Sequence, residues 1–558
     1  MPRSVLDERL ARLEKDGFVA RLHSRDASLW SADAATQSAI KDRLGWLTIA
    51  EKMAGAAEEL RAFASQVRDA GIRDVVLLGM GGSSLAPEVL RATLGVAPGY
   101  PHLTVLDTTD PATVLALERK LDLSRTLFIV ASKSGATIEV LSLFAYFRER
   151  LGAVKAGSEG ESFIAITDEG TPLQALAREH RFRRVFLNPS DVGGRYSALS
   201  YFGMVPAALI GADVGLLLRR AAAMAEVCAS GSAPADNPGV WLGATLGELA
   251  LAGRDKLTLL PSLALAAFGG WVEQLVAEST GKEGRGILPV EGEPPASPDV
   301  YGDDRLFVQL RLETDASADD ALEALRRAGH PVVDICLQNP YDLGAEFYRW
   351  EVATATAGAI LGVNPFDEPN VAESKANTEK LLEIYRAEGA LPEGTPAFSE
   401  DAVAVFADDS SGSLMEALAS LVRRLRPGGY LALAAYLPET PAVRAALQSM
   451  RLALRDATKA ATTLGFGPRY LHSTGQLHKG GRDNGVFLLF TADAAEDAAV
   501  PGQPYTFGVL KRAQALGDLE ALRRRRRPVL RLHLPAGVEA GLARVASALA
   551  SAVGTDTR

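Results

Sequence analysis

The chain has 558 residues, of which 47% are hydrophobic and 23% charged, and its formal net charge is −10. This length exceeds what a single hydrophobic core supports, so two or three domains are expected, and the acidic balance argues against nucleic acid as a partner. The two cysteines, Cys228 and Cys336, exclude a disulfide framework and a cysteine-based metal site.

No targeting or membrane segment is expected. The start, Met1–Ser4, leads into a charged helical pattern that lacks the apolar core of a signal peptide. No uncharged apolar run reaches the ~18 residues that a membrane span requires. We therefore expect a cytoplasmic protein that does not contact a membrane.

Residues 1–50 are predicted to form an N-terminal helical arm, and residues 51–235 a first α/β domain. In this domain short apolar strands alternate with helical stretches, which is typical of a doubly wound parallel sheet covered on both faces. The expected strands are Val75–Leu78, Leu103–Leu106, Leu127–Val130, Phe163–Ile166 and Val185–Leu187.

Residues 236–558 are predicted to form a second domain of the same kind with a C-terminal extension. Its expected strands include Leu257–Leu260 and Leu306–Leu312, with a helix over Leu263–Glu278 between them. The loop Glu291–Asp299 is rich in proline and glutamate and is expected to be exposed.

A third alternating stretch follows in the C-terminal part of the chain. It begins with the expected strand Val403–Phe406 and includes a helix predicted over Pro441–Thr463. The pattern fits two arrangements equally well: the stretch completes the second sheet, or it adds a small lobe of its own.

Two short loops follow apolar strands of the first domain and precede helices. They are Gly79–Ser84 and Ser132–Thr137. Helix N-termini present unpaired N–H groups and a partial positive charge, and both loops surround them with small residues and hydroxyls. Lys133 adds a full charge. Because ligands of such folds gather at the carboxyl ends of the strands, the loops predict a phosphorylated small molecule as the ligand.

Two charged side chains are candidates for the chemistry. Arg195 follows two glycines after the fifth strand, where a guanidinium can stabilise a developing oxyanion; the alternative is a loop arginine paired with a surface acid. Gln274 and Glu278 lie four residues apart, on one face near the end of an apolar helix. A carboxylate in such a place suits a general base, although pairing with Lys282 or Arg285 would also explain it.

The C-terminal half holds weaker candidates. Lys375 lies early in a helix, and His472 and His478 lie in a polar run typical of a site loop. A metal site is not expected, because the histidine spacing matches no standard ligand set and no acidic cluster accompanies it. The run Arg523–Arg527 is interpreted as a solvated helix face without a catalytic role.

In order along the chain, a set of segments resembles the phosphoglucose isomerase family. They are Gly79–Ser84, Ser132–Glu139, Gly193–Ser197, Gln274–Lys282 and Asn364–Val371. The resemblance spans most of the chain and implies two sugar-isomerase (SIS) domains, each a three-layer α/β/α sandwich. The stretch around Arg469–Gly475 is most similar to the isomerase half of bacterial transaldolase–phosphoglucose isomerase fusions. Nothing in the sequence indicates the eight-stranded barrel of the transaldolase half.

The resemblance implies an intramolecular oxidoreductase that interconverts glucose 6-phosphate and fructose 6-phosphate in glycolysis and gluconeogenesis. Glu278 would move a proton between C2 and C1 through a cis-enediolate that Arg195 stabilises, with Lys375 near the ring oxygen. The residues that the resemblance assigns to substrate binding are Gly82, Ser83, Ser132, Lys133, Ser134, Thr137, Gly194 and Gln274. A proton shuttle of this kind needs no metal or other cofactor, so none is expected; the expected partners are the sugar phosphate and a second copy in a homodimer.

The ring-opening histidine departs from the family pattern. In the family it follows the catalytic glutamate, but Val300–Arg305 contains no histidine. His472 or His478 takes that part, or Lys375 and a water suffice; we favour His472. In the family this histidine comes from the partner subunit, which would complete the site between two chains.

Two other functions remain open. A sugar-phosphate sensor or regulator could use the same loops without catalysis, but it would not need Glu278 together with Arg195. Such regulators usually carry a DNA-binding helix-turn-helix, for which the sequence offers no convincing candidate. An isomerase of broader specificity would also accept mannose 6-phosphate or another 6-substituted sugar.

Overall fold

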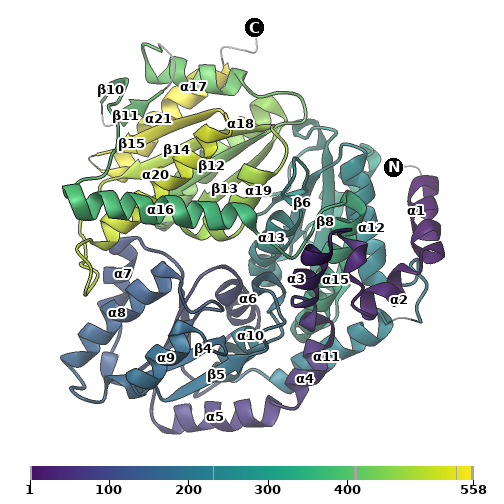
Figure 1. Ribbon diagram of the computed structural model, residues 1–558. Helices are drawn as coiled ribbons and strands as arrows, with labels where there is room; N and C mark the ends of the chain where they lie inside the picture. Colours follow the sequence, from purple (N-terminus) through teal and green to yellow (C-terminus); the bar gives the residue numbers. More distant parts are fainter. Residues whose placement is uncertain (1–2, 230, 402, 408–410, 536, 555–558) are drawn as a thin grey trace.

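Figure 1 shows a computed structural model of the chain, which describes residues 3–229, 231–401, 403–407, 411–535 and 537–554. Met1 and Pro2, named above at the start of the sequence, lie outside the described residues. The described strands form three sheets, with helices between most successive strands. The α/β class and the predicted parallel sheets are thereby confirmed. Within the described ranges, no helix combines the length and the apolar character needed to cross a bilayer.

The first sheet has five parallel strands in the order β2-β1-β3-β4-β5. Successive residues face opposite sides, so Val75 and Leu77 belong to one hydrophobic core and Val76 and Leu78 to another. Both faces are covered, which explains the continuous apolar runs of these strands. The strands are β1 (Asp74–Gly79), β2 (His102–Leu106), β3 (Thr126–Ala131), β4 (Phe163–Asp168) and β5 (Arg184–Asn188). The helices between them are α6 (Leu85–Leu94), α7 (Pro111–Glu118), α8 (Ile138–Gly152) and α9 (Pro172–Glu179).

The strand order of this sheet places the two predicted loops side by side. From β1 the chain moves outward to β2, whereas from β3 it moves in the opposite direction to β4. A crevice forms at the carboxyl ends of two neighbouring strands whose connections diverge in this way. The loops 79–84 and 132–137 follow these two strands, so both lie at the crevice.

The second sheet has four parallel strands in the order β7-β6-β8-β9. One face shares a large hydrophobic core with the first sheet, and the other covers a small core around Phe307. The strands are β6 (Lys256–Pro261), β7 (Leu288–Val290), β8 (Arg305–Leu312) and β9 (Val332–Leu337). The helices of this region are α10 (Tyr201–Leu209), α11 (Val214–Val227), α12 (Pro238–Leu251), α13 (Ala266–Thr280), α14 (Asp319–Arg327) and α15 (Leu343–Leu361).

The C-terminal stretch forms a third sheet of its own, in the order β10-β11-β15-β14-β12-β13, and therefore does not complete the second sheet. Four of its strands are parallel, and β11 and β10 add an antiparallel edge. In Figure 1 this sheet lies in the green-to-yellow part of the chain, with α16 in front of it. The strands are β10 (Phe398–Glu400), β11 (Val403–Phe406), β12 (Tyr430–Tyr436), β13 (Ala461–Phe466), β14 (Gly485–Ala492) and β15 (Val529–Leu534). The helices are α16 (Pro369–Glu388), α17 (Leu414–Arg423), α18 (Pro441–Thr458), α19 (Gly475–Gly480), α20 (Phe507–Arg524) and α21 (Val538–Gly554).

The helix predicted over Pro441–Thr463 is too long at its C-terminus. It ends at Thr458, and Lys459 adopts a left-handed conformation with a φ of 58°. The residues after it form β13, which pairs with β12. Threonines of this segment pack well in an extended strand, and the helical periodicity of the preceding residues masked the change.

The N-terminal arm is anchored across the large core. Trp30 is buried and donates a hydrogen bond from its indole N–H to the carbonyl of Ala355 in α15, at 2.9 Å. Leu44 forms an isolated antiparallel bridge with Val192, so the arm lies beside the loop that follows β5. Its helices are α1 (Arg3–Lys15), α2 (Phe18–His23), α3 (Ala34–Lys41) and α4 (Ile49–Ala54), and α5 (Ala57–Asp69) follows.

The exposure predicted for the loop Glu291–Asp299 is wrong for one residue. Glu293 is only 3% exposed. Its carboxylate lies 3.4 Å from the guanidinium of Arg305, which is itself fully buried at the start of β8. A buried arginine needs an anionic partner, and the neighbouring loop supplies it.

The arginine run is also less solvated than predicted. Arg527 is 7% exposed, and its guanidinium donates to the carbonyl of Gly481 at 2.8 Å. Arg525 pairs with Glu373 of α16, with a hydrogen bond of 2.9 Å. Part of the run therefore fastens the end of α20 to the helix that carries Lys375.

Candidate active site

A cavity of about 460 Å³, here called the polar cavity, opens at the crevice of the first sheet. Its size is typical of a small-molecule site. Its walls come from the loops after β1, β3 and β5, from α13 and α16, and from the 3₁₀ turn η10 (Arg469–His472). The predicted site residues that line it are Gly82, Ser83, Lys133, Ser134, Thr137, Gly194, Arg195, Gln274, Glu278, Lys375 and His472. Ser132 lies just behind the wall, with its hydroxyl 2.9 Å from that of Thr137.

One end of the polar cavity has the features of an anion site. Thr137 is the N-cap residue of α8, and its side chain accepts no hydrogen bond from the first turn. The N–H groups of that turn are thus free of a side-chain cap and point their dipole toward the loop. Lys133 is the local cation; its ammonium contacts the carboxylate of Asp168 and donates to the carbonyl of Ser190 at 3.1 Å.

Two glycines allow the walls of the cavity to approach one another. A Cβ atom on Gly82 would lie 2.0 Å from the carbonyl oxygen of Gly194. Gly81 has a φ of +54°, and a Cβ atom there would lie 2.7 Å from Nε2 of Gln274. Side chains at these positions would therefore separate the first loop from the residues before Arg195 and from α13.

Arg195 is held in one position by hydrogen bonds. Its side chain is only 6% exposed. Nε donates to Ser279 Oγ at 3.1 Å, and Nη2 donates to the carbonyl of Pro365 at 3.0 Å. Nη1 lies 2.9 Å from a carboxylate oxygen of Glu368 and 3.5 Å from one of Glu278. Both acidic partners line the cavity. Burial by itself would lower the pKa of Arg195, but the negative charges of Glu278 and Glu368 outweigh this effect and keep the pKa above its ordinary value.

Glu278 lies deep in the cavity beside the guanidinium. Nε2 of Gln274, one turn earlier in α13, donates to its carboxylate at 3.1 Å. Lys282 is not its partner: the ammonium lies 2.7 Å from a carboxylate oxygen of Asp367 instead. Burial raises the pKa of Glu278, and the adjacent charge of Arg195 opposes that rise. A buried carboxyl with a raised pKa is the group that a general base near neutral pH requires.

His472 enters the cavity as part of a hydrogen-bonded chain. Its Nε2 donates to Glu139 Oε1 at 3.1 Å, and Nε2 of Gln514 donates to the same oxygen at 2.8 Å. The hydroxyl of Thr109 in turn donates to Gln514 Oε1 at 2.7 Å and fixes the amide orientation. Burial opposes ionisation of Glu139, but the contact with His472 holds its pKa below the ordinary value. A carboxylate only accepts, so Nε2 carries the proton and Nδ1 is left for other contacts.

The other histidine candidate belongs to the hydrophobic core. His478 does not line the polar cavity; its Nδ1 lies 2.9 Å from the hydroxyl of Tyr430, and its ring packs against Phe487. Burial lowers the pKa of His478 to about 3, which keeps the imidazole neutral. Of the two histidines, only His472 reaches the cavity.

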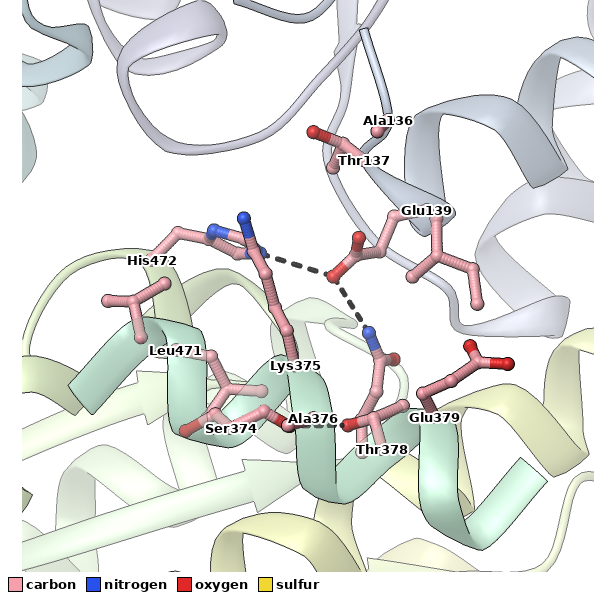
Figure 2. A pocket seen from close by; sticks show the side chains of 13 residues that line it. Ala136, Thr137, Glu139, Ser374, Lys375, Ala376, Thr378, Glu379, Leu471 and His472 are labelled. Atoms are coloured by element: carbon pink, nitrogen blue, oxygen red, sulfur yellow. Dashed lines mark hydrogen bonds and ion pairs between the residues drawn. The ribbon is translucent and has the colours of Figure 1, made fainter. Parts of the chain in front are cut away.

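A second cavity of about 320 Å³ adjoins the first and shares Thr137, Val371, Lys375 and His472 with it. Figure 2 shows its lining, with the side chain of Lys375 rising from α16 beside the ring of His472. Glu139 faces the histidine from the first turn of α8. The structure therefore brings together the lysine, the histidine and the second loop, which are far apart in the sequence.

Several residues of the site were not singled out from the sequence. They are Arg43, Glu139, Asp168, Glu169, Glu368 and Gln514. Two of them lie in segments that the sequence marks as part of the site: Glu139 lies in 132–139 and Glu368 in 364–371. For Arg43 and Gln514 no local pattern was available, because only tertiary packing brings them to the site.

The fold and the site together define a parallel-sheet α/β protein whose cavity combines an uncapped helix N-terminus and Lys133 with the buried carboxyl of Glu278. Comparison with known proteins gives the family. The sequence profile of the phosphoglucose isomerase family, described as "Phosphoglucose isomerase", matches residues 46–286. A glucose-6-phosphate isomerase from Rubrobacter xylanophilus is 31% identical over 369 residues, which cover 56% of this chain and 84% of that protein. The chain belongs to the phosphoglucose isomerase family.

Solved structures agree on the fold. A crystal structure of a hypothetical protein from Thermus thermophilus matches with a TM-score of 0.58 and 26% identity, over 67% of this chain and 96% of that one. A glucose-6-phosphate isomerase from Chlamydia trachomatis matches with a TM-score of 0.53 and 21% identity, over 66% of this chain and 78% of that one. The profile match ends at residue 286, before Lys375 and His472; these two residues are placed at the site by their position on the polar cavity.

Proposed function

We propose that this chain is an intramolecular oxidoreductase that interconverts glucose 6-phosphate and fructose 6-phosphate through a cis-enediolate. The observation that carries the proposal is the convergence of Glu278 and Arg195 on one cavity whose other end is an uncapped helix N-terminus with Lys133. A phosphate group held at that end places the sugar carbons toward the carboxylate. Family membership supports the same reaction.

Binding begins with the phosphate in this proposal. The backbone N–H groups at the start of α8 and the hydroxyls of Ser134 and Thr137 donate to its oxygens, and Ser132 orients the hydroxyl of Thr137 from behind the wall. Lys133 contributes charge, and Gly82 and Ser83 face the sugar hydroxyls from the first loop. Gln274 and the backbone at Gly194 complete this wall.

Ring opening falls to His472, assisted by Lys375. The neutral imidazole accepts the proton of the hydroxyl at C1 or C2 on its free Nδ1 and then passes this proton to the ring oxygen; the Glu139 carboxylate stabilises the positive charge that the imidazole carries in between. The hydrogen-bonded chain through Gln514 to Thr109 keeps this carboxylate in place. Lys375 lies beside the histidine, where its charge favours electron density on the ring oxygen.

Proton transfer between carbons falls to Glu278. The carboxylate removes the proton from C2 of the open-chain aldose, and the electron pair becomes the enediolate. The same carboxyl then returns the proton to C1, while the hydroxyl proton moves from O2 to O1. Arg195 stabilises the negative charge on the enediolate oxygens, because its guanidinium is already fixed beside Glu278.

We further propose that one chain supplies the whole site. His472 lies on the same polar cavity as Glu278 of its own chain, so a second copy is not needed to deliver the histidine. A homodimer remains the proposed assembly. In each chain we propose residues 1–50 as the arm, 51–235 as the first domain and 236–558 as the second domain, which contains two sheets. The similarity of the C-terminal segment to transaldolase–isomerase fusions is carried by the residues around His472.

Mixing two inactive variants tests the single-chain site. Glu278→Gln and His472→Ala, coexpressed with different affinity tags, give mixed dimers in which each chain has one defect. A site within one chain predicts no recovered activity. Recovery of about half of the wild-type activity in the purified mixed dimers, which would have one intact site of two, would mean that the histidine acts across the interface.

A coupled assay with fructose 6-phosphate, run beside mannose 6-phosphate, tests the reaction itself. We expect the wild-type chain to turn over fructose 6-phosphate. Glu278→Gln should lose this turnover but still bind the sugar phosphate. Turnover of both substrates would favour an isomerase of broader specificity. Binding without turnover of either sugar would favour the regulator, against which the buried pair of Glu278 and Arg195 argues.

A further inference from the structure

The polar cavity contains a cation to which the mechanism above gives no part. Arg43, from the N-terminal arm, lines the cavity together with Lys133, Asp168 and Gly193. Its side chain is half-buried. Among the described residues, none lies within hydrogen-bond or ion-pair distance of its guanidinium. An arginine inside a ligand cavity without a protein partner is available to a ligand.

The charges of the cavity explain why such a group is needed. The cations that line it are Arg43, Lys133, Arg195 and Lys375, and the carboxylates are Asp168, Glu169, Glu278 and Glu368. Lys133 is paired with Asp168, and Arg195 with Glu278 and Glu368. Both cations are therefore largely neutralised before a ligand arrives. Lys375 has no ion-pair partner in the described residues, but it stands beside His472 (Figure 2), where the ring oxygen is expected.

The backbone around Arg43 is fixed against the loop that precedes Arg195. Its N–H donates to the carbonyl of Ile40 at 2.8 Å, and the next residue forms the bridge to Val192. A Cβ atom on Gly193 would lie 3.8 Å from Cδ of Arg43, so the aliphatic stem runs along this glycine. The guanidinium is thus directed by two chain segments, while no group in the described part of the chain accepts a hydrogen bond from its N–H groups.

The position of Arg43 links the two ends of the cavity. Burial raises the pKa of Asp168, and the positive charges of Lys133 and then Arg43 oppose that rise. Burial also opposes ionisation of Glu368, and Arg43 adds to the charge of Arg195 in lowering its pKa. Arg43 is therefore within electrostatic reach of both carboxylates, of which Asp168 pairs with Lys133 and Glu368 with Arg195.

We propose that Arg43 is a substrate-binding residue that holds the phosphate of the sugar phosphate against the loop 132–137; this inference rests on the proposed function. A guanidinium presents N–H donors in a planar fork that matches two phosphate oxygens at once, which an ammonium cannot do. A dianionic phosphate gives Arg43 the partner that the protein does not supply. The N-terminal arm then takes part in selecting phosphorylated over neutral sugars.

Steady-state kinetics of Arg43→Gln, with inorganic phosphate as a competitive inhibitor, tests the proposal. We expect KM for fructose 6-phosphate and Ki for phosphate to rise together by about 10- to 100-fold, with kcat changed by less than about threefold. In Arg43→Lys, KM and Ki should lie between the values of the wild type and of Arg43→Gln, because lysine keeps the positive charge but lacks the planar fork of N–H donors. Lys52→Gln is the matched control: it removes one charge from α4, close in sequence to Arg43 but outside the cavity, and its constants should stay at wild-type values.

The outcomes separate this inference from the proposed function. KM and Ki within twofold of wild type in both Arg43 variants would overturn it while leaving the isomerase reaction intact. If the wild-type chain turned over no sugar phosphate, calorimetric titration with inorganic phosphate would still compare the variants, and equal affinities would overturn it. Because the guanidinium of Arg43 has no hydrogen-bond or ion-pair partner within the described protein, its substitution breaks no such bond, and nearly unchanged thermal unfolding should accompany the loss of phosphate affinity.

Discussion

Replacement of Glu139 by glutamine should slow ring opening without disabling the proton transfer between C1 and C2. Glutamine has the same shape and keeps an oxygen that accepts hydrogen bonds from His472 and Gln514, so the change removes the negative charge alone. Glu139 lies outside the polar cavity, behind the imidazole, and acts through His472. It is a positioning residue in the proposed mechanism.

The size of the effect follows from the distance between the charges. At 3.1 Å, an imidazolium and a carboxylate attract each other by about 5 kcal/mol at an effective dielectric constant of about 20. Desolvation of the fully buried carboxylate offsets much of this attraction, and hydrogen bonds to charged groups contribute about 1.5–3 kcal/mol net. With about 1.4 kcal/mol per tenfold change, kcat/KM for the cyclic sugar phosphate should fall by about 10- to 150-fold in Glu139→Gln.

A substrate that cannot close a ring separates the two steps. In an aldotetrose 4-phosphate the phosphate occupies the hydroxyl that would form the ring, so exchange of the C2 proton with deuterated solvent reports on Glu278 alone. Glu139→Gln should exchange this proton at nearly the wild-type rate, whereas Glu278→Gln should not. Equal losses with cyclic and acyclic substrates in Glu139→Gln would refute the assignment of ring opening to His472.

Three further substitutions test two parts of the site and one buried carboxyl outside it. Lys133→Ala should raise KM by about 10- to 100-fold with a smaller change in kcat, and an unchanged KM would remove this lysine from the phosphate site. Burial is the main cause of the raised pKa of Glu278, and the negative charge of Glu368 adds to it. Glu368→Gln removes this charge. The base then stays ionised at lower pH, so the acidic limb of the kcat/KM profile should move to lower pH; movement to higher pH would contradict the coupling. Glu351 is fully buried, neither carboxyl oxygen has a hydrogen-bond partner among the described residues, and burial raises its pKa well above the ordinary value. The folded state therefore keeps a proton that the unfolded state loses above about pH 4.3, and stability falls as pH rises from there toward the folded pKa. Glutamine does not titrate, so Glu351→Gln removes this fall in stability with pH. The unfolding free energy of the variant, relative to that of the wild type, should therefore rise by about 1.4 kcal/mol per pH unit. Melting temperatures that differ between the two proteins by the same amount at pH 5 and at pH 8 would contradict this prediction.

Local patterns in the sequence were sufficient for the strands of the first sheet and for the first half of the site. The apolar strands β1 and β3 and the helices after them are readable from their periodicity, and the loops between them are rich in glycine and hydroxyl side chains. The spacing of Gln274 and Glu278 places both on one face of α13, because four residues make about one helical turn. Each of these features depends on contacts within a few residues along the chain.

The third sheet is the main feature of the fold that the sequence left open. Its strands are as apolar as those of the second sheet, so periodicity does not tell which sheet they join. Strand pairing decides: β12 pairs with β13 and β14, and β15 continues the sheet from β14. β13 was missed because the helical periodicity of the preceding residues masks the turn at Lys459, where the helix ends.

The sequence by itself determined that two loops rich in glycine and hydroxyl side chains lie at the carboxyl ends of two parallel strands, and that Glu278 shares a helix face with Gln274. Only the tertiary structure decided what surrounds them. His472 meets Glu139 across 333 residues of sequence, and Arg195 is shared between Glu278 and Glu368. The physical reason is the range of the interactions. Helix and strand periodicity is set by neighbours along the chain, whereas the partner of a buried charge is set by how separately folded layers pack, and no local pattern records that packing.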